Sequence, residues 1–195
     1  MINEHAHVRA GETVVIYGAG VIGLSCVQFA ALAGAAKIII VARKGAQKVR
    51  VKLAMELGAT HYVSNDDLST VPGEIQKIVG DYYVDHVIDT TGMPEILMQA
   101  IDIVKNEGTV IRAGINSREI PCSMNRVTLK GIKLIGHHAF TTTSWVNSIR
   151  LAEEGKLPLL SKIITHVLPL SQWEDGFKAM GNGEAAKVVL VPEDD

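Results

Sequence analysis

The chain has 195 residues, which at roughly 150 residues per domain predicts one domain plus an extension and excludes a third globular unit. Its 19 Lys and Arg residues against 21 Asp and Glu residues give a net charge of −2, so there is no basic field for a nucleic acid. Of its residues, 47% are hydrophobic but only 5% are aromatic, so aliphatic side chains must form the core, as in parallel sheets covered by helices on both faces. The composition predicts a folded α/β protein.

The two cysteines, Cys26 and Cys122, lie far apart and form no CxxC pair. This pattern argues against a disulfide framework and a structural zinc knuckle, and it favours a reducing, cytoplasmic compartment. Residues 1–12 carry His, Glu and Arg where a secretory signal needs an apolar core, so we expect no export signal there.

The predicted elements alternate along the chain. Short β-branched runs predict six strands, at residues 13–17, 37–41, 61–63, 85–89, 109–113 and 132–136. Apolar residues at helical spacing predict the intervening helices, at residues 21–33, 46–57, 74–79 and 94–104. Right-handed crossovers then predict a doubly wound parallel sheet of the Rossmann type with strand order 3-2-1-4-5-6, spanning residues 9–138.

Residues 14–36 carry no charge and are long enough to cross a bilayer as a helix. The β-branched start of this stretch and its closely spaced glycines instead predict a strand, a turn and a helix, so we expect no membrane association. In the tail, residues 139–195, we predict helices at 141–154 and 171–180, separated by 163–168, and a last strand at 187–191. This tail is not expected to form another βαβ unit.

A GxGxxG motif follows the first predicted strand and opens the first predicted helix. Its residues are Gly18, Ala19, Gly20, Val21, Ile22 and Gly23. In that position the glycines permit a tight turn, approach of the backbone to a pyrophosphate and close packing of helix and strand, while the helix N-terminus supplies N–H groups for the anion. Leu24 follows where a triphosphatase loop has Lys. The motif predicts dinucleotide binding over the alternative of a merely compact turn.

The end of the second strand bears on the choice of dinucleotide. An acid there would bind the ribose 2′-hydroxyl of NAD, but the sequence has Ala42 followed by Arg43 and Lys44, with Lys48 in the next helix. These cations suit the 2′-phosphate of NADP, although they could also be solvated loop charges.

The nicotinamide half of the cofactor is expected at the ends of the fourth and fifth strands. The small or hydroxyl-bearing residues there are Thr90, Thr91, Gly92, Ala113, Gly114 and Ile115. The glycines could equally serve only to turn the chain. No general acid or base can be nominated: no tyrosine is followed four residues later by lysine, and the adjacent His137 and His138 point to opposite faces of a strand.

Several segments, in order, resemble the zinc-type medium-chain alcohol and polyol dehydrogenases, such as sorbitol and threonine dehydrogenases. They are GETVVIYGAGVIGL (11–24), AMELGAT (54–60), DTTG (89–92), GTV (108–110), LKG (129–131), ITHVLPL (164–170) and KVVLVP (187–192). The resemblance implies hydride transfer between NAD(P) and a secondary alcohol or its ketone, with a catalytic zinc as Lewis acid. In that family the zinc-bearing domain precedes the motif, so its ligands are expected outside this chain.

Two hypotheses remain, with a lesser third. The chain is either the cofactor-binding and C-terminal part of a larger dehydrogenase, inactive alone, or a free-standing NADP-binding module that senses redox state or docks on a partner. A zinc-free quinone or enoyl reductase is the lesser alternative. The first hypothesis predicts an exposed apolar patch at 163–168 or 188–191, where the family's tail packs on the missing domain. The resemblance also implies a homodimer through the edge of the sixth strand.

Overall fold

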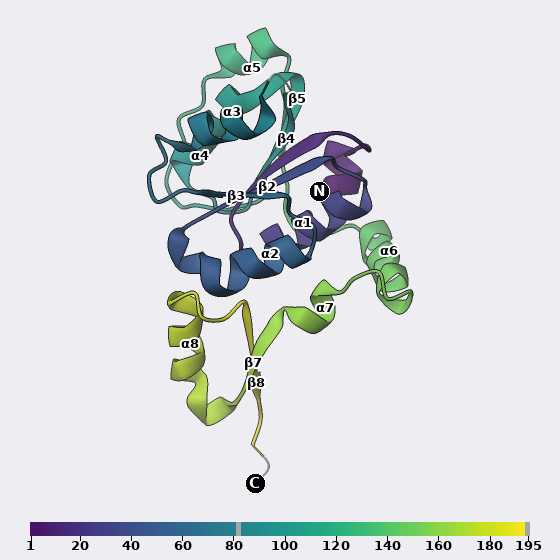
Figure 1. The fold of residues 1–195 in the computed structure, drawn as a ribbon, viewed down its shortest axis with the longest axis vertical. Coiled ribbons are helices and arrows are strands. Elements are labelled where there is room, and N and C mark those ends of the chain that lie inside the picture. Colours follow the sequence, from purple (N-terminus) through teal and green to yellow (C-terminus); the bar gives the residue numbers. More distant parts are fainter. Residues whose placement is uncertain (81–82, 194–195) are drawn as a thin grey trace.

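Six parallel strands form the central sheet, in the order β3-β2-β1-β4-β5-β6 (Figure 1). The computed structural model describes residues 1–80 and 83–193. The strands are β1 (Thr13–Tyr17), β2 (Lys37–Ala42), β3 (His61–Ser64), β4 (Val84–Asp89), β5 (Val104–Arg112) and β6 (Lys133–Gly136). The predicted α/β class, parallel pairing and strand order are confirmed.

Both faces of the sheet are buried, which explains why its strands read as continuous apolar runs. In β1, Val14 and Ile16 enter one core cluster, whereas Val15 and Tyr17 enter the other. Helices α1 (Val21–Leu32) and α2 (Lys52–Glu56) cover the first face. Helices α3 (Val71–Val79), α4 (Pro94–Ile103) and α5 (Met124–Lys130) cover the second (Figure 1).

Three elements differ from the sequence prediction. Helix α5, between β5 and β6, was not predicted, because its seven residues bury only Val127 and so show no apolar periodicity. The helix predicted at 46–57 is instead a 3-10 turn (Lys44–Ala46), a π-helical turn (Gln47–Val51) and the short α2. Strand β5 begins five residues earlier than predicted, and its pairing with β4 is irregular between Val104 and Thr109.

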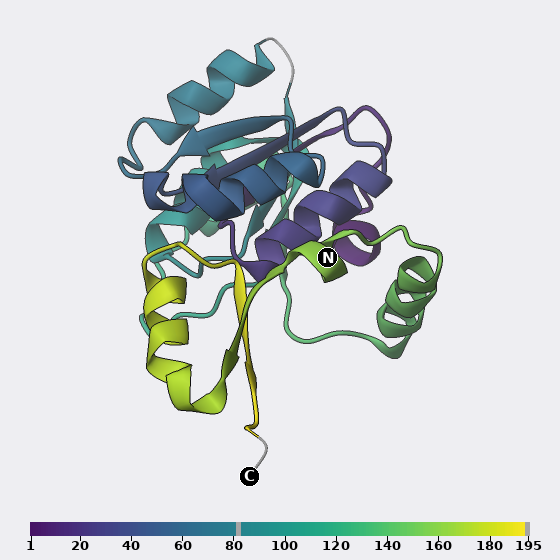
Figure 2. The same ribbon diagram turned by 60° about the horizontal axis from the view of Figure 1, so that its bottom comes forward.

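The tail contains a small βαβ unit of its own, so the prediction that it would not form one is wrong. Strands β7 (Ile164–Pro169) and β8 (Lys187–Val191) pair in parallel around α8 (Trp173–Gly181), below the main sheet (Figure 2). The rest of the tail is α6 (Thr142–Glu153), α7 (Leu159–Lys162) and the 3-10 turn Leu170–Gln172; at the other end of the chain, Ile2–Ala6 forms a π-helical turn. The sequence pattern does not predict this unit, because it indicates residues 163–168 only as a segment between two helices.

The tail exposes apolar side chains, as the first hypothesis predicts. Val167 is 60% exposed and Ile164 and Val191 are also exposed, whereas Ile163 is buried against the core. Helix α6 buries none of its residues and projects from the side of the molecule (Figure 2).

The uncharged stretch 14–36 folds as β1, α1 and the turn that follows α1. Within the described residues no helix has the length and apolarity that a membrane crossing requires.

The two cysteines differ in environment, and we expect their reactivity to differ accordingly. Cys26 on α1 is buried, and loss of solvation raises the pKa of its thiol to about 12. Cys122, in the loop before α5, is partly accessible. Labelling of the native protein with a disulfide reagent at pH 8 should therefore modify Cys122 at once and Cys26 only after urea is added. The Cys122→Ser variant is the control, because Cys26 is then its one thiol. Rapid labelling of both thiols in the wild-type protein, and of Cys26 in the folded Cys122→Ser variant, would contradict the burial of Cys26.

Candidate functional site

A cleft of about 750 Å³ opens at the carboxyl ends of β1, β2 and β4. This is the edge of a doubly wound sheet at which ligands bind. The loop after β1 forms its floor, the loops after β2 and β3 form one end, and the loop after β4 forms the other. A turn of the tail, residues 181–183, closes the remaining side.

The glycine loop has the backbone geometry that the sequence predicts. Gly18 has φ +99°, a left-handed conformation, and its N–H donates to the Val41 carbonyl at 2.8 Å. A Cβ on Gly23 would lie 1.8 Å from the carbonyl oxygen of Gly18, so only glycine lets α1 start so close to β1. A Cβ on Gly20 would meet no atom within 4 Å. The backbone is thus bare where it faces the cleft.

The first turn of α1 lies at this floor with an uncapped N-terminus. Gly20 is its N-cap residue, and no side chain caps the helix. The first N–H groups of a helix have no intrahelical partners and carry the positive end of the helix dipole. Of the six predicted loop residues, five line the cleft and Gly23 lies behind them: the lining residues are Gly18, Ala19, Gly20, Val21 and Ile22.

Only part of the predicted cationic patch faces the cleft. Ala42 and the exposed Arg43 line it, whereas the side chains of Lys44 and Lys48 are exposed but lie outside the lining set. The backbone N–H of Lys44 donates to the Asp66 carboxylate, at 3.2 Å to Oδ2. Arg43 is therefore the cation of this patch that a bound ligand would meet.

Two polar residues at the same end were not predicted, because they follow β3 and not β2. The hydroxyl of Ser64 donates to Asp66 at 2.8 Å, and this bond holds the pKa of Asp66 below its ordinary value, with smaller contributions from Lys44 and Arg43. Asn65, next to it, has a buried side-chain oxygen with no hydrogen-bond partner among the described residues. Both residues line the cleft.

The loops after β4 and β5 are fixed to each other by a buried ion pair. Asp89 is fully buried, and its Oδ1 accepts from the N–H and the hydroxyl of Thr91, at 2.8 and 2.7 Å, and from the N–H of Gly92 at 3.2 Å. Arg112 Nη1 donates to Asp89 Oδ2 at 2.8 Å. A Cβ on Gly114 would lie 2.0 Å from Gly92 N, so the two loops touch.

Five of the six residues predicted for the nicotinamide half line one of two hollows. Thr90 and Thr91 line the large cleft, where the Thr90 hydroxyl donates to the Tyr17 carbonyl at 2.7 Å. The residues after β5 line an adjoining hollow of about 390 Å³, which also borders His137 and His138; they are Ala113, Gly114 and Ile115. Gly92 lines neither hollow and instead supports Gly114.

The tail contributes a wall of the cleft, which the sequence pattern did not predict. Arg50, after the β2 loop, donates to the Met180 carbonyl at 2.7 Å and to the Ala185 carbonyl at 3.0 Å, so it holds both sides of the turn 181–183. A Cβ on Gly183 would lie 2.7 Å from the carbonyl oxygen of Gly45. These contacts join residues at least 130 positions apart, beyond the reach of any local sequence pattern.

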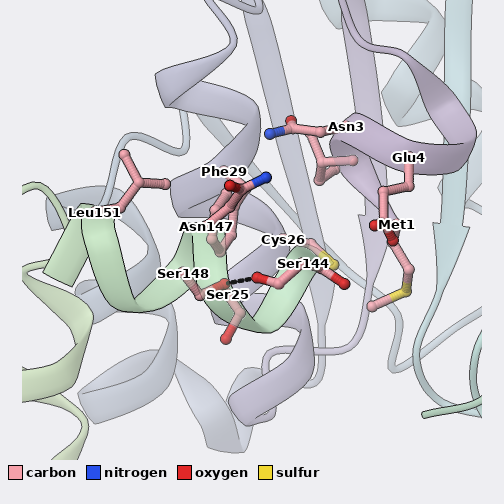
Figure 3. Close-up of a pocket in the computed structure, with 11 residues that line it drawn as sticks. Met1, Asn3, Glu4, Ser25, Cys26, Phe29, Ser144, Asn147, Ser148 and Leu151 are labelled. Atoms are coloured by element: carbon pink, nitrogen blue, oxygen red, sulfur yellow. Dashed lines mark hydrogen bonds between the residues drawn. The ribbon is translucent and has the colours of Figure 1, made fainter. Parts of the chain in front are cut away.

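A smaller cavity, of about 190 Å³, lies between the N-terminal turn, α1 and α6 (Figure 3). It is lined by Met1, Cys26, Phe29 and Leu151 with a polar rim that includes Ser144, whose carbonyl accepts from the Ser148 hydroxyl at 2.8 Å. None of the predicted site residues borders it. Across residues 1–80 and 83–193, no three His, Cys, Asp or Glu side chains gather in a metal-binding arrangement, so these residues supply no zinc site.

Comparison with known proteins places this geometry in a family. The sequence model described as "Zinc-binding dehydrogenase" matches residues 21–154. The chain is 37% identical over 190 residues to the uncharacterized zinc-type alcohol dehydrogenase-like protein YdjL of Escherichia coli, covering 97% of this chain and 52% of that protein. It is 32% identical over 187 residues to L-threonine 3-dehydrogenase of Bacillus velezensis, covering 94% and 52%.

Solved structures agree. The crystal structure of an alcohol dehydrogenase from Thermotoga maritima superposes with a TM-score of 0.82 at 29% identity, covering 98% of this chain and 53% of that one. The chain spans about half the length of the curated relatives it matches. Since the family match extends from the glycine loop through α6, more than half of the residues, the chain belongs to the zinc-binding dehydrogenase family.

Proposed function

We propose that this chain is the nicotinamide-dinucleotide-binding portion of a zinc-type alcohol or polyol dehydrogenase, with NADP(H) preferred. The observation that carries the proposal is the bare backbone at Gly20, at the uncapped N-terminus of α1, lining a cleft of about 750 Å³. The residues fit the group: helix N–H groups would hold the pyrophosphate, Arg43 the 2′-phosphate, and the loops after β4 and β5 the nicotinamide.

The cofactor would exchange a hydride with a secondary alcohol or ketone in the intact enzyme. Within the described residues no three His, Cys, Asp or Glu side chains gather as metal ligands. Following the family resemblance, the groups that polarise the substrate oxygen are proposed to lie in another part of such an enzyme, so that this chain by itself is inactive. Residues 9–138 are its cofactor domain. The exposed apolar side chains of 139–195 support the idea that this segment packs on a further domain, and they disfavour a free-standing sensor or docking module.

A homodimer and a cytoplasmic location are part of the same proposal. Strand β6 is an edge of the main sheet, and an edge strand offers unpaired N–H and C=O groups to a second copy. The proposed compartment rests on the cysteine pattern.

Calorimetric titration with NADP⁺ and NAD⁺ tests the cofactor assignment. The wild-type chain should bind both, NADP⁺ more tightly, because Arg43 faces the cleft where the 2′-phosphate would lie. In the Ala42→Asp, Arg43→Ala double variant the preference should reverse to NAD⁺, by about tenfold or more, since a carboxylate replaces a cation. An unchanged preference in the double variant would rule out the charge argument, and no binding of either dinucleotide by the wild-type chain would overturn the assignment of the glycine loop.

A further inference from the structure

The loop after β3 carries an acidic residue, Asp66, next to the end of β2, where the sequence has no acid. Ala42, at the end of β2, pairs with Ser64 at the end of β3, so the loops that follow these two residues leave the sheet side by side. Asp66 lies two residues beyond Ser64 and accepts from the backbone N–H of Lys44, two residues beyond Ala42. A carboxylate therefore reaches the adenosine end of the cleft although the residue at the end of β2 is alanine.

The Asp66 carboxylate has capacity left for a ligand. Its Oδ2 accepts the Ser64 hydroxyl at 2.8 Å and the Lys44 N–H at 3.2 Å, and its Oδ1 has only the longer contact to Lys44 N, at 3.4 Å. An ionised carboxylate offers about four acceptor positions. Because Asp66 is exposed and lines the cleft, its free positions are accessible to a ligand bound there.

Asn65 gives an independent sign of a missing donor at this end. Its buried side-chain oxygen has no partner among the described residues, although a buried acceptor normally has one. Asn65 lines the cleft beside Asp66, so an N–H or O–H of a bound nucleoside could supply that partner. Two adjacent acceptors, one of them charged, are suited to hydroxyl and amino groups and not to a phosphate.

We propose that Asp66 is a cofactor-specificity residue that accepts the ribose 2′-hydroxyl of NAD(H) and repels the 2′-phosphate of NADP(H). The inference rests on the proposed dinucleotide function and refines it: Arg43 and Asp66 act in opposite directions on the same 2′ position. The chain then accepts both cofactors, with a preference for NADP(H) smaller than Arg43 alone would give. The acid that discriminates between them is supplied by β3 in place of β2.

The alternative role for Asp66 is to cap the Lys44 N–H and nothing more. The Asp66→Asn variant separates the two roles, because an amide oxygen still accepts from Lys44 and Ser64 while the charge is lost. Asp67→Asn is the matched control. Asp67 is also exposed and also accepts from a serine, Ser69, at 2.6 Å, but it does not line the cleft.

The experiment is calorimetric titration of the full chain with NADP⁺ and with NAD⁺ for wild type, Asp66→Asn, Asp66→Ser and Asp67→Asn, with each variant's Tm measured first. Loss of the Asp66 charge should strengthen NADP⁺ binding about fivefold and weaken NAD⁺ binding about twofold, raising the ratio of the Kd for NAD⁺ to the Kd for NADP⁺ by about tenfold in both Asp66 variants. Asp67→Asn should leave the ratio unchanged.

The outcomes separate this inference from the function it builds on. Dinucleotide binding with the same ratio in wild type and both Asp66 variants would overturn the inference and leave the proposed function standing. An equal change in Asp67→Asn would also overturn it, because the effect would then be a general one of surface charge. Failure of the wild-type chain to bind either dinucleotide would overturn the proposed function, and the inference with it.

Discussion

Replacing Gly20 by alanine is expected to weaken dinucleotide binding without disturbing the fold, whereas replacing Gly23 by alanine is expected to destabilise the fold itself. Gly20 has φ −76° and ψ −178°, which alanine adopts freely, and its Cβ would meet no protein atom within 4 Å. That Cβ would project over the floor of the cleft, where the pyrophosphate must approach the backbone. The added methyl group should weaken binding by about tenfold to a hundredfold.

At Gly23 the Cβ would collide with the protein and not with a ligand. It would lie 1.8 Å from the Gly18 carbonyl oxygen and 2.9 Å from the carbonyl carbon, both backbone atoms that cannot rotate away. Relief requires α1 to move from β1, at a cost of about 3 kcal/mol, the upper end of the usual overpacking penalty. Urea unfolding should show this loss for Gly23→Ala and a change below about 0.5 kcal/mol for Gly20→Ala.

The two glycine variants act as controls for each other. Both add one methyl group to the same loop, so a shared effect on stability would mean that the loop is merely compact and not built for a ligand. A Gly20→Ala protein that binds NADP⁺ as tightly as the wild type would exclude the pyrophosphate from the floor of this cleft.

Replacing Arg112 by methionine is expected to cost about 3–5 kcal/mol of unfolding free energy, the usual loss when one partner of a buried ion pair is removed. Asp89 has no exposed surface, and Arg112 is the cation that faces it. Without that cation the carboxylate stays buried and holds only its three bonds to Thr91 and Gly92. Arg112 also donates to the Gly92 carbonyl, so the loop that borders the cleft should loosen.

Arg126→Met is the control for this prediction. Arg126 pairs with Asp102, but the two side chains are 53% and 49% exposed, so solvent screens the pair and its loss should cost less than about 1 kcal/mol. Urea unfolding of both variants gives the comparison. Equal losses of unfolding free energy in the two variants would show that burial does not determine how much the Asp89–Arg112 pair stabilises the fold. Adding Asp89→Asn to Arg112→Met should recover part of the loss, because the uncompensated charge is then gone.

The fold was predictable because its determinants are local. The strands of the main sheet are β-branched runs that alternate with segments of helical spacing, and the right-handed crossovers leave few possible orders, of which 3-2-1-4-5-6 is common in doubly wound sheets. The elements that were missed lack a local pattern: α5 buries a single side chain, and β7 has β8 as its one neighbouring strand. A strand with one neighbour and an exposed face has little periodicity to detect.

The sequence by itself determined the sheet, the glycine loop at the end of β1 and the lack of an acid at the end of β2, because turn geometry and periodicity depend on neighbouring residues. Only the tertiary structure decided what surrounds the cleft. It brought Asp66 and Asn65 to the same cleft as Arg43, left Lys44 and Lys48 outside the lining of that cleft, and joined the tail turn to Arg50 by hydrogen bonds. These contacts join separate elements at the carboxyl edge of the sheet, where strand order, and not position along the chain, determines which loops meet.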